Sequence, residues 1–168
     1  MAAAMTYLGM DKCDIDIFLF DTFEGMPEPG EKDYLASSGE LARDLPAASK
    51  SADGVRAYAP IEEVQRNLES TGYPAEHLHL VKGLVEDTIP AGAPDEISVL
   101  RLDTDWYAST RHEMVHLYPR LAKNGVLIID DYGHWAGARA AVDEYFAESN
   151  LHPLLNRIDS TGRICIKT

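Results

Sequence analysis

Two short apolar segments that each end in aspartate most constrain the fold of this chain. Residues 97–102 (ISVLRL) run into Asp103. Residues 125–129 (GVLII) run into the pair Asp130 and Asp131. Near-continuous apolar runs of this length are typical of strands buried in a parallel sheet. Because a helical pattern lies between them, the order strand, helix, strand predicts an α/β layered fold.

The rest of the chain supports the same class of fold. Residues 15–20 form a further apolar strand that ends at Asp21, and residues 78–82 form a short strand. Helices are expected over residues 1–8, from 61 to the stop at 72–74, over 107–121 and over 137–148. Residues 153–158 and 163–167, on either side of a turn, predict a C-terminal antiparallel hairpin. The sheet is therefore expected to be parallel in the main, with that hairpin at one edge.

Residues 24–60 differ in composition from the remainder. This stretch is rich in proline and glycine and carries polar and alanine-rich sequence. Such punctuation predicts a long insertion with short helical pieces, of the kind that covers a binding site as a lid. We expect one domain over residues 1–168, with residues 24–60 as its lid or insertion.

The composition limits the partners and the compartment. The chain has 15 Lys and Arg against 28 Asp and Glu, a net charge of −13, which argues against nucleic acid or an anionic membrane surface as partner. No apolar run approaches the roughly 20 residues that span a bilayer, and the start lacks a signal-peptide pattern. Two distant cysteines make no disulfide framework. A cytoplasmic protein is therefore expected.

Four acids at the ends of two strands are the main candidates for chemistry. In open α/β sheets ligands bind beyond the carboxyl ends of the strands, which is where Asp103, Asp105, Asp130 and Asp131 are expected to meet. Like charges this close need a cation, and carboxylate oxygens suit Mg²⁺. The alternative is that each acid caps a helix or a turn. Four acids on two consecutive strand ends favour a metal site.

Asp21 ends an earlier strand and has two readings of its own. An acid at the tip of an early strand in such a sheet often accepts hydrogen bonds from ribose hydroxyls. A residue that only closes the turn explains the same position, and the sequence leaves both open.

The segment 112–116 (HEMVH) matches the zinc metalloprotease pattern H-E-x-x-H. The buried stripe of its helix is expected to contain Met114 and Leu117, so His112 and His116 should point to solvent on the opposite side. A catalytic zinc also requires a third protein ligand in an enclosed site. We therefore interpret the match as coincidental.

The sequence from Arg101 onward, RLDTDWYAST followed by LYPRLAKNGVLIIDDYGHWAGARAAVDEYF, resembles the macrocin O-methyltransferase (TylF-like) family. The resemblance extends to FLFDTFEGMPEP (18–29) and LVKGLVEDTIP (80–90), so it covers most of the chain. It implies a Rossmann-like methyltransferase sheet and S-adenosylmethionine- and Mg²⁺-dependent O-methylation of a sugar hydroxyl. The implied substrate is a small-molecule glycoside or natural product, and relatives are commonly oligomeric, which implies a homo-oligomer.

The resemblance also assigns roles to individual residues. It implies that Asp103, Asp130 and Asp131 bind the metal and that Asp105 is the general base. It places the cofactor at Asp21, Thr22, Gly83, Leu84 and Asp103, with Asp21 on the ribose and the segment of Gly83 and Leu84 along the adenine.

One family feature has no counterpart in this sequence. Members carry a first strand and a glycine-rich loop (E/D-x-G-x-x-x-G) before the strand equivalent to residues 15–21, whereas residues 1–14 contain only Gly9. We expect that strand and loop to be missing. This leaves a second hypothesis, a truncated and inactive methyltransferase-like domain that binds a metal or a protein partner, and a third, a metal-dependent phosphoester hydrolase.

Overall fold

The computed structural model describes residues 1–9, 14–45 and 58–168. Among these, the α-helices are α1 (Ala2–Tyr7), α3 (Ile61–Glu69), α4 (Val85–Thr88), α5 (Tyr107–Leu117) and α6 (Ala136–Glu148). The strands are β1 (Ile17–Asp21), β2 (Leu78–Lys82), β3 (Ile97–Leu102), β4 (Leu121–Ile129), β5 (Asn156–Arg157) and β6 (Arg163–Ile166). Single 3-10 turns occur at Ala42–Asp44, Ala75–His77 and Tyr118–Arg120. None of the described helices combines the length and apolar character needed to cross a bilayer.

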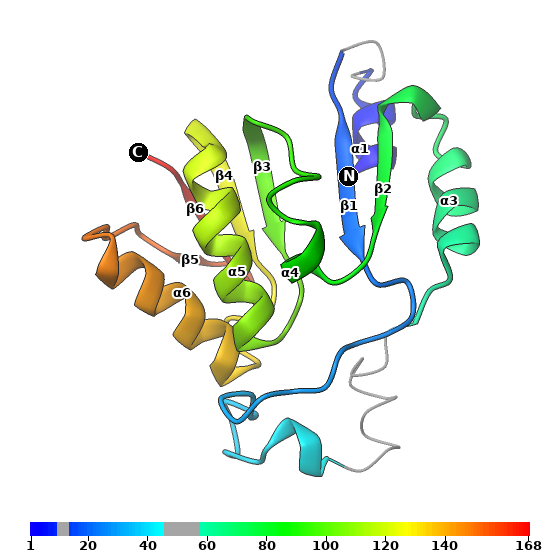
Figure 1. Ribbon diagram of the computed structural model, residues 1–168. Coiled ribbons are helices and arrows are strands. Elements are labelled where there is room, and N and C mark those ends of the chain that lie inside the picture. Colours follow the sequence, from blue (N-terminus) through cyan, green and yellow to red (C-terminus); the bar gives the residue numbers. More distant parts are fainter. Residues whose placement is uncertain (10–13, 46–57) are drawn as a thin grey trace.

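The strands form the predicted α/β architecture, but in two sheets (Figure 1). The first contains β1 and β2, which are parallel. The second has the order β3-β4-β6-β5, in which β3 and β4 are parallel and the C-terminal hairpin is antiparallel, as expected. Among the described residues, β1 pairs only with β2. β3 is the terminal strand of the larger sheet and pairs only with β4. Each of these two strands therefore has one edge without a ladder partner in that part of the chain.

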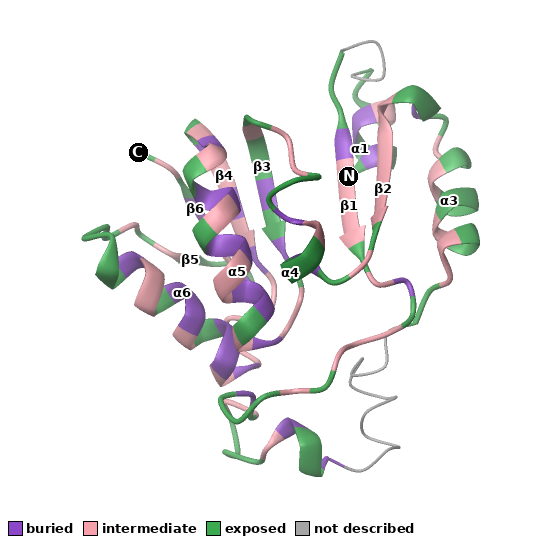
Figure 2. Ribbon diagram, viewed as in Figure 1, coloured by how far each residue is buried: buried purple, intermediate pink, exposed green. Residues whose placement is uncertain are grey.

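The main core lies between the larger sheet and its two long helices, which cover one face of it (Figures 1 and 2). Alternate residues of β3 and β4 point into this core, among them Leu102 and Leu127, and they meet Met114 of α5 and Val142 of α6. Each of these four side chains is at most 2% exposed. The turns after β3 and β4 leave this packed layer at the carboxyl ends of the two parallel strands.

Two boundaries differ from the sequence prediction for one reason. The helix predicted over residues 107–121 ends at Leu117, and β4 begins at Leu121 instead of at Gly125. Pro119 lacks the N–H that would continue the α-helix, so residues 118–120 form a 3-10 turn and the chain then becomes extended.

The prediction that His112 and His116 face solvent is wrong. Both are half-buried, and their rings lie 4.4 Å apart. The Nε2 atom of His112 is 2.9 Å from the carbonyl oxygen of Ile89, in the loop after α4. α5 is covered by α4 as well as by the sheet and α6, so more of its surface is buried than a single apolar stripe suggests. Neither histidine belongs to the carboxylate cluster described below.

The described part of the predicted insertion is folded against the body of the protein. Residues 22–45 cross beneath α5 and α6 (Figure 1), and Leu35 forms an isolated antiparallel bridge with Trp135. Residues 46–57 lie outside the described residues, so the structure does not test that part of the lid predicted over residues 24–60.

Candidate functional site

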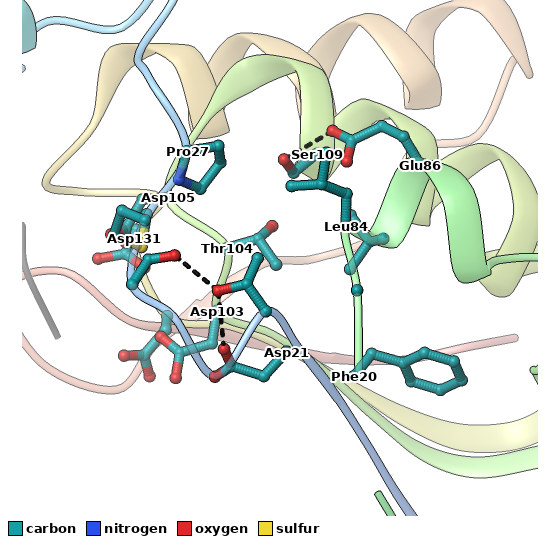
Figure 3. Close-up of a pocket in the computed structure, with 16 residues that line it drawn as sticks. Phe20, Asp21, Pro27, Leu84, Glu86, Asp103, Thr104, Asp105, Ser109 and Asp131 are labelled. Carbon is teal, nitrogen blue, oxygen red and sulfur yellow. Dashed lines mark hydrogen bonds between the residues drawn. The ribbon is translucent and has the colours of Figure 1, made fainter. Parts of the chain in front are cut away.

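A cleft of about 360 Å³ lies at the carboxyl ends of β1, β2, β3 and β4. Figure 3 shows Asp105 and Asp131 on one side of it and Leu84 and Phe20 on the other. The structure brings to this cleft every residue for which the sequence predicts a metal, cofactor or base role: Asp21, Thr22, Gly83, Leu84, Asp103, Asp105, Asp130 and Asp131 all line it. The cleft lies between the two sheets, because its walls come from the tips of both.

The turn between β3 and α5 has an unusual backbone. The N–H of Trp106 donates to the carbonyl oxygen of Thr104 at 2.6 Å, and the intervening Asp105 has a φ of +62°. This is a γ-turn with positive φ at its centre, a rare and strained form. Strain of this kind is retained where the surrounding structure enforces it, commonly at functional sites. The turn places Asp103 and Asp105 close together at one rim of the cleft.

Three carboxylates meet at this rim. Asp103, Asp105 and Asp131 each offer one oxygen, and these three atoms lie within 4.8 Å of one another. Asp131 Oδ2 is buried and has no hydrogen-bond partner among the described residues. A buried acceptor without a donor costs free energy, so this atom points to a positively charged or hydrogen-bonding ligand.

Burial and the close approach of these carboxylates also change their pKa values. Burial raises the pKa of Asp105 to about 9, and its hydrogen bond and charge interaction with Asp131 act in the same direction. Burial raises the pKa of Asp103 to about 7, although the positive charge of Arg101 opposes the shift. Ionising all of these acids would therefore place more negative charge here than the surroundings neutralise, and a divalent cation would offset it.

Asp130 is placed differently from Asp131. Its Oδ1 lies 3.1 Å from Arg101 Nη2, the same atom that lies 2.9 Å from Asp103 Oδ2. All three side chains of this ion pair are between 42% and 49% exposed. Asp130 therefore lines the cleft with a protein cation as its neighbour, outside the group of three oxygens.

The opposite rim carries Asp21 at the end of β1. Its Oδ1 accepts the backbone N–H of Phe23 at 2.7 Å, which closes the turn after the strand, while the side chain stays exposed. The Thr22 hydroxyl donates to the Gly25 carbonyl at 2.6 Å. Beside them, Gly83 donates its N–H to the carbonyl oxygen of Asp21 at 3.0 Å and has a φ of +145°, a conformation that favours glycine. The turn on this rim also has a positive φ at Phe23 (+53°), and its carboxylate at Asp21 is open to a ligand.

Two polar pairs at the cleft were not anticipated from the sequence. The Thr104 hydroxyl donates to Glu113 Oε2 at 2.8 Å. The Ser109 hydroxyl donates to Glu86 Oε1 at 2.8 Å (Figure 3). Glu113 is only 5% exposed, and burial raises its pKa to about 8. The signal was present, since Thr110, Glu113, Met114 and Leu117 follow the spacing of a buried helix stripe. Charged residues in such a stripe are usually exposed, so the spacing alone does not identify Glu113 as buried.

A sheet with helices on one face, a cleft at its strand tips and an acidic group on one rim defines a cofactor-binding α/β fold. The sequence model of the family described as macrocin-O-methyltransferase (TylF) matches residues 1–166. The chain belongs to this family.

Similar proteins of known activity support the assignment. The chain is 34% identical over 152 residues to demethyldecarbamoylnovobiocin O-methyltransferase of Streptomyces niveus, covering 90% of this chain and 55% of that protein. It is 35% identical over 146 residues to 8-demethyl-8-(2,3-dimethoxy-alpha-L-rhamnosyl)-tetracenomycin-C 4'-O-methyltransferase of Streptomyces olivaceus, covering 87% of this chain and 52% of that one. The chain thus spans about half the length of these relatives.

Solved structures agree on the fold. The O-methyltransferase NovP superposes with a TM-score of 0.80 and 31% identity, covering 99% of this chain and 66% of its own. The calicheamicin methyltransferase CalS11 superposes with a TM-score of 0.71 at 20% identity, covering 98% of this chain and 65% of its own, and this likeness shows the fold alone.

Proposed function

We propose that this chain carries the metal-binding and cofactor-binding rims of an S-adenosylmethionine- and Mg²⁺-dependent O-methyltransferase that acts on a sugar hydroxyl of a glycoside. The observation that carries the proposal is the group of three carboxylate oxygens, which lies in the same cleft as the Asp21 rim. The named activities of the similar proteins, all O-methyltransferases, support the reaction class.

The residues present fit a hard divalent cation. The donor set consists of carboxylate oxygens, which Mg²⁺ prefers, and Asp131 Oδ2 is buried with no hydrogen-bond partner among the described residues. We propose Asp103, Asp130 and Asp131 as its ligands, with Asp130 leaving Arg101 to take part. When bound, Mg²⁺ would supply positive charge that offsets these acids and polarises an acceptor oxygen.

The opposite rim fits the cofactor. A cleft of about 360 Å³ lies in the range of small-ligand sites. We propose that the exposed carboxylate of Asp21 accepts hydrogen bonds from ribose hydroxyls, beside Thr22, and that the segment of Gly83 and Leu84 lines the adenine. Asp103 would reach the cofactor from the other rim. S-adenosylmethionine supplies the methyl group when it is bound.

The chain's own contribution to the chemistry is proton removal and positioning. A sugar hydroxyl is a poor nucleophile at neutral pH, so a base must hold its proton as the new bond forms. We propose Asp105 as that base, because its carboxylate lies in the cluster at the cleft, where a cation bound beside it would keep it ionised and able to take the proton. The strained turn holds Asp105 at this place, and correct placement accounts for much of the rate in such transfers.

Binding measurements test the proposal directly. We expect calorimetric titration of the chain to detect S-adenosylmethionine and, separately, Mg²⁺ or Mn²⁺. Methyl transfer to a glycoside acceptor should then require both and stop when the cation is chelated. Full transfer in the presence of excess chelator would disprove the role of the metal.

A second function is favoured by β1 and β3, each of which has one edge without a ladder partner among residues 1–9, 14–45 and 58–168. With the sheet divided between β1 and β3, the acid cluster on β3 and β4 can stay intact while the cofactor is not held. The chain would then be a methyltransferase-like domain that binds a cation or a protein partner. Cation binding without any S-adenosylmethionine binding at millimolar concentration would select this function over the first.

We further propose a cytoplasmic homo-oligomer, as expected from the sequence. Light scattering coupled to gel filtration measures the oligomeric state, and a mass equal to the 18.6 kDa chain would contradict it.

A further inference from the structure

The segment that follows β1 contains a buried carboxylate that takes no part in the proposed reaction. Asp33 is 1% exposed. Its Oδ2 accepts the backbone N–H of Gly30 and its Oδ1 accepts the backbone N–H of Tyr107, both at 2.7 Å. Burying an acid is costly unless such donors satisfy it, so this position is built around the carboxylate.

The bond to Tyr107 ties this segment to the proposed base. Tyr107 is the first residue of α5, and its N–H is one of the groups that a helix cannot satisfy internally. The preceding residue provides no side-chain cap, and Asp33 supplies the acceptor from 74 positions away in the sequence. Its negative charge also suits the N-terminus of the helix. The backbone is thus fixed two residues after Asp105.

The same segment, residues 26–45, also holds the turn after β4; we call it the wall segment. Its Ala36 N–H donates to the carbonyl oxygen of His134 at 2.9 Å, and its Tyr34 carbonyl accepts the N–H of Ala136 at 3.0 Å. These bonds begin three residues after Asp131. The wall segment therefore contacts both acid-bearing turns.

Aromatic packing joins the three parts. The indole N–H of Trp106 donates to the carbonyl oxygen of Pro27 at 2.8 Å, and the Trp106 and Trp135 rings pack edge to face at 4.9 Å. Met26 and Leu35 of the wall segment cover this pair. These are the two tryptophans of the chain, so their fluorescence reports on this contact.

Gly137 shows how tightly Asp33 is seated. A side-chain carbon added at Gly137, in the first turn of α6, would overlap Asp33 Oδ1 and come within 3.1 Å of the Tyr107 nitrogen. Because residue 137 is glycine, α6 leaves room for the Asp33 carboxylate at the start of α5.

We propose that Asp33 is a positioning residue for the carboxylate cluster. Through its buried carboxylate the wall segment holds the turns of Asp105 and Asp131 at the spacing that a divalent cation requires. Asp33 acts without touching the cation. The inference rests on the cation site proposed above, and it predicts that cation affinity depends on a side chain outside that site.

The test compares the variants Asp33→Ala, Asp33→Asn, Asp95→Asn and Gly137→Ala by calorimetric titration with Mn²⁺. The temperature is one at which circular dichroism shows each variant folded. We expect Asp33→Ala to weaken binding about 10-fold, in the range found for residues that support metal ligands. Asp33→Asn keeps one oxygen acceptor and should lose less. Asp95→Asn, a control with the same change of charge on an exposed loop, should match the unmodified chain. Unchanged Mn²⁺ affinity in Asp33→Ala, even with a lower melting temperature, would overturn the proposal.

Gly137→Ala tests the same contact from the other side. Helix propensity alone favours alanine over glycine, so a purely local effect would strengthen α6. We expect instead weaker Mn²⁺ binding, because the added methyl displaces Asp33. Binding equal to that of the unmodified chain would contradict the steric argument.

A second readout separates this inference from the cation site. Amide hydrogen exchange at Tyr107 reports its bond to Asp33 in the absence of any metal. We expect faster exchange and altered tryptophan fluorescence in Asp33→Ala and Gly137→Ala, but not in Asp95→Asn. If the unmodified chain binds no Mn²⁺, the proposed cation site is wrong. If exchange at Tyr107 is unchanged in both variants, the positioning role of Asp33 is wrong.

Discussion

Asp21 at the end of β1 and the acids at the ends of β3 and β4 lie on opposite rims of one cleft, yet their surroundings differ. Asp21 is exposed and accepts a hydrogen bond from its own turn. Asp105 and Asp131 are half-buried, share one small volume, and leave one buried oxygen without a donor. On one rim the aspartate carboxylate therefore accepts a hydrogen bond from its own turn. On the other rim a carboxylate oxygen has no donor among the described residues and requires a ligand. A strand-tip aspartate indicates a cation only when its neighbours cannot satisfy it.

The largest effect is expected at the rim that carries Asp103, Asp105 and Asp131. Asp131→Ala removes a proposed ligand and should weaken Mn²⁺ binding by about 100-fold or more, beyond the effect of losing a supporting residue. Asp130→Ala should cost less, because Asp130 is paired with Arg101 in the absence of a cation. Calorimetric titration of both variants measures the difference. Equal losses would show that Asp130 leaves Arg101 and binds the cation as fully as Asp131.

A smaller effect is expected at the open rim. Asp21→Ala deprives the Phe23 N–H of its acceptor, which should lower the free energy of unfolding by about 1 kcal/mol. If Asp21 holds the ribose, S-adenosylmethionine affinity should fall about 10-fold, the equivalent of one charged hydrogen bond. Mn²⁺ affinity should stay the same, because Asp21 lies outside the cluster. A loss of Mn²⁺ binding in this variant would mean that the two rims are not independent.

The smallest effect is a dependence on pH. The pKa of Asp103 is raised to about 7 and that of Asp105 to about 9, whereas an unfolded aspartate titrates near 3.9. From about pH 4 upward the folded chain holds protons that the unfolded chain has released, so without a cation its stability falls as pH rises through 7 and 9.

A cation needs ionised ligands, so Mg²⁺ should raise the melting temperature more at pH 8 than at pH 5.5. Differential scanning calorimetry with and without Mg²⁺ gives both curves, and Asp131→Ala serves as the control in which the added stability should vanish. Stability that is flat or rising between pH 5 and 9 without the cation would contradict the raised pKa values.

Much of the fold followed from the sequence because it depends on local pattern. The strands that end at Asp21, Asp103 and Asp130 were recognisable as apolar runs, and parallel topology then brings their tips together. That is why every proposed site residue lines one cleft. The end of α5 was misjudged because the effect of Pro119 was not taken into account.

The remaining features depend on contacts between distant parts of the chain. Asp33 and Tyr107 are 74 positions apart, and no periodic pattern connects them. The burial of Glu113 was not predicted, because a buried helix stripe is identified in a sequence by its apolar residues. The pairing of Asp130 with Arg101 distinguishes two adjacent aspartates that look equivalent in sequence. Tertiary structure decides such cases.

The division of the strands into two sheets has a consequence for how the chain unfolds. The β1–β2 sheet packs mainly on its own cluster, which includes Met5, Ile17 and Tyr73, and only Phe20 of its described hydrophobic residues packs against the core of the larger sheet. Among the described residues no strand ladder joins these two bodies, so heating can melt them in separate steps. A ligand that contacts both rims binds only when both bodies are folded, and its binding energy then links their melting. Cooperativity of unfolding is thus expected to come from the occupied cleft, with two calorimetric transitions merging into one as ligand is added.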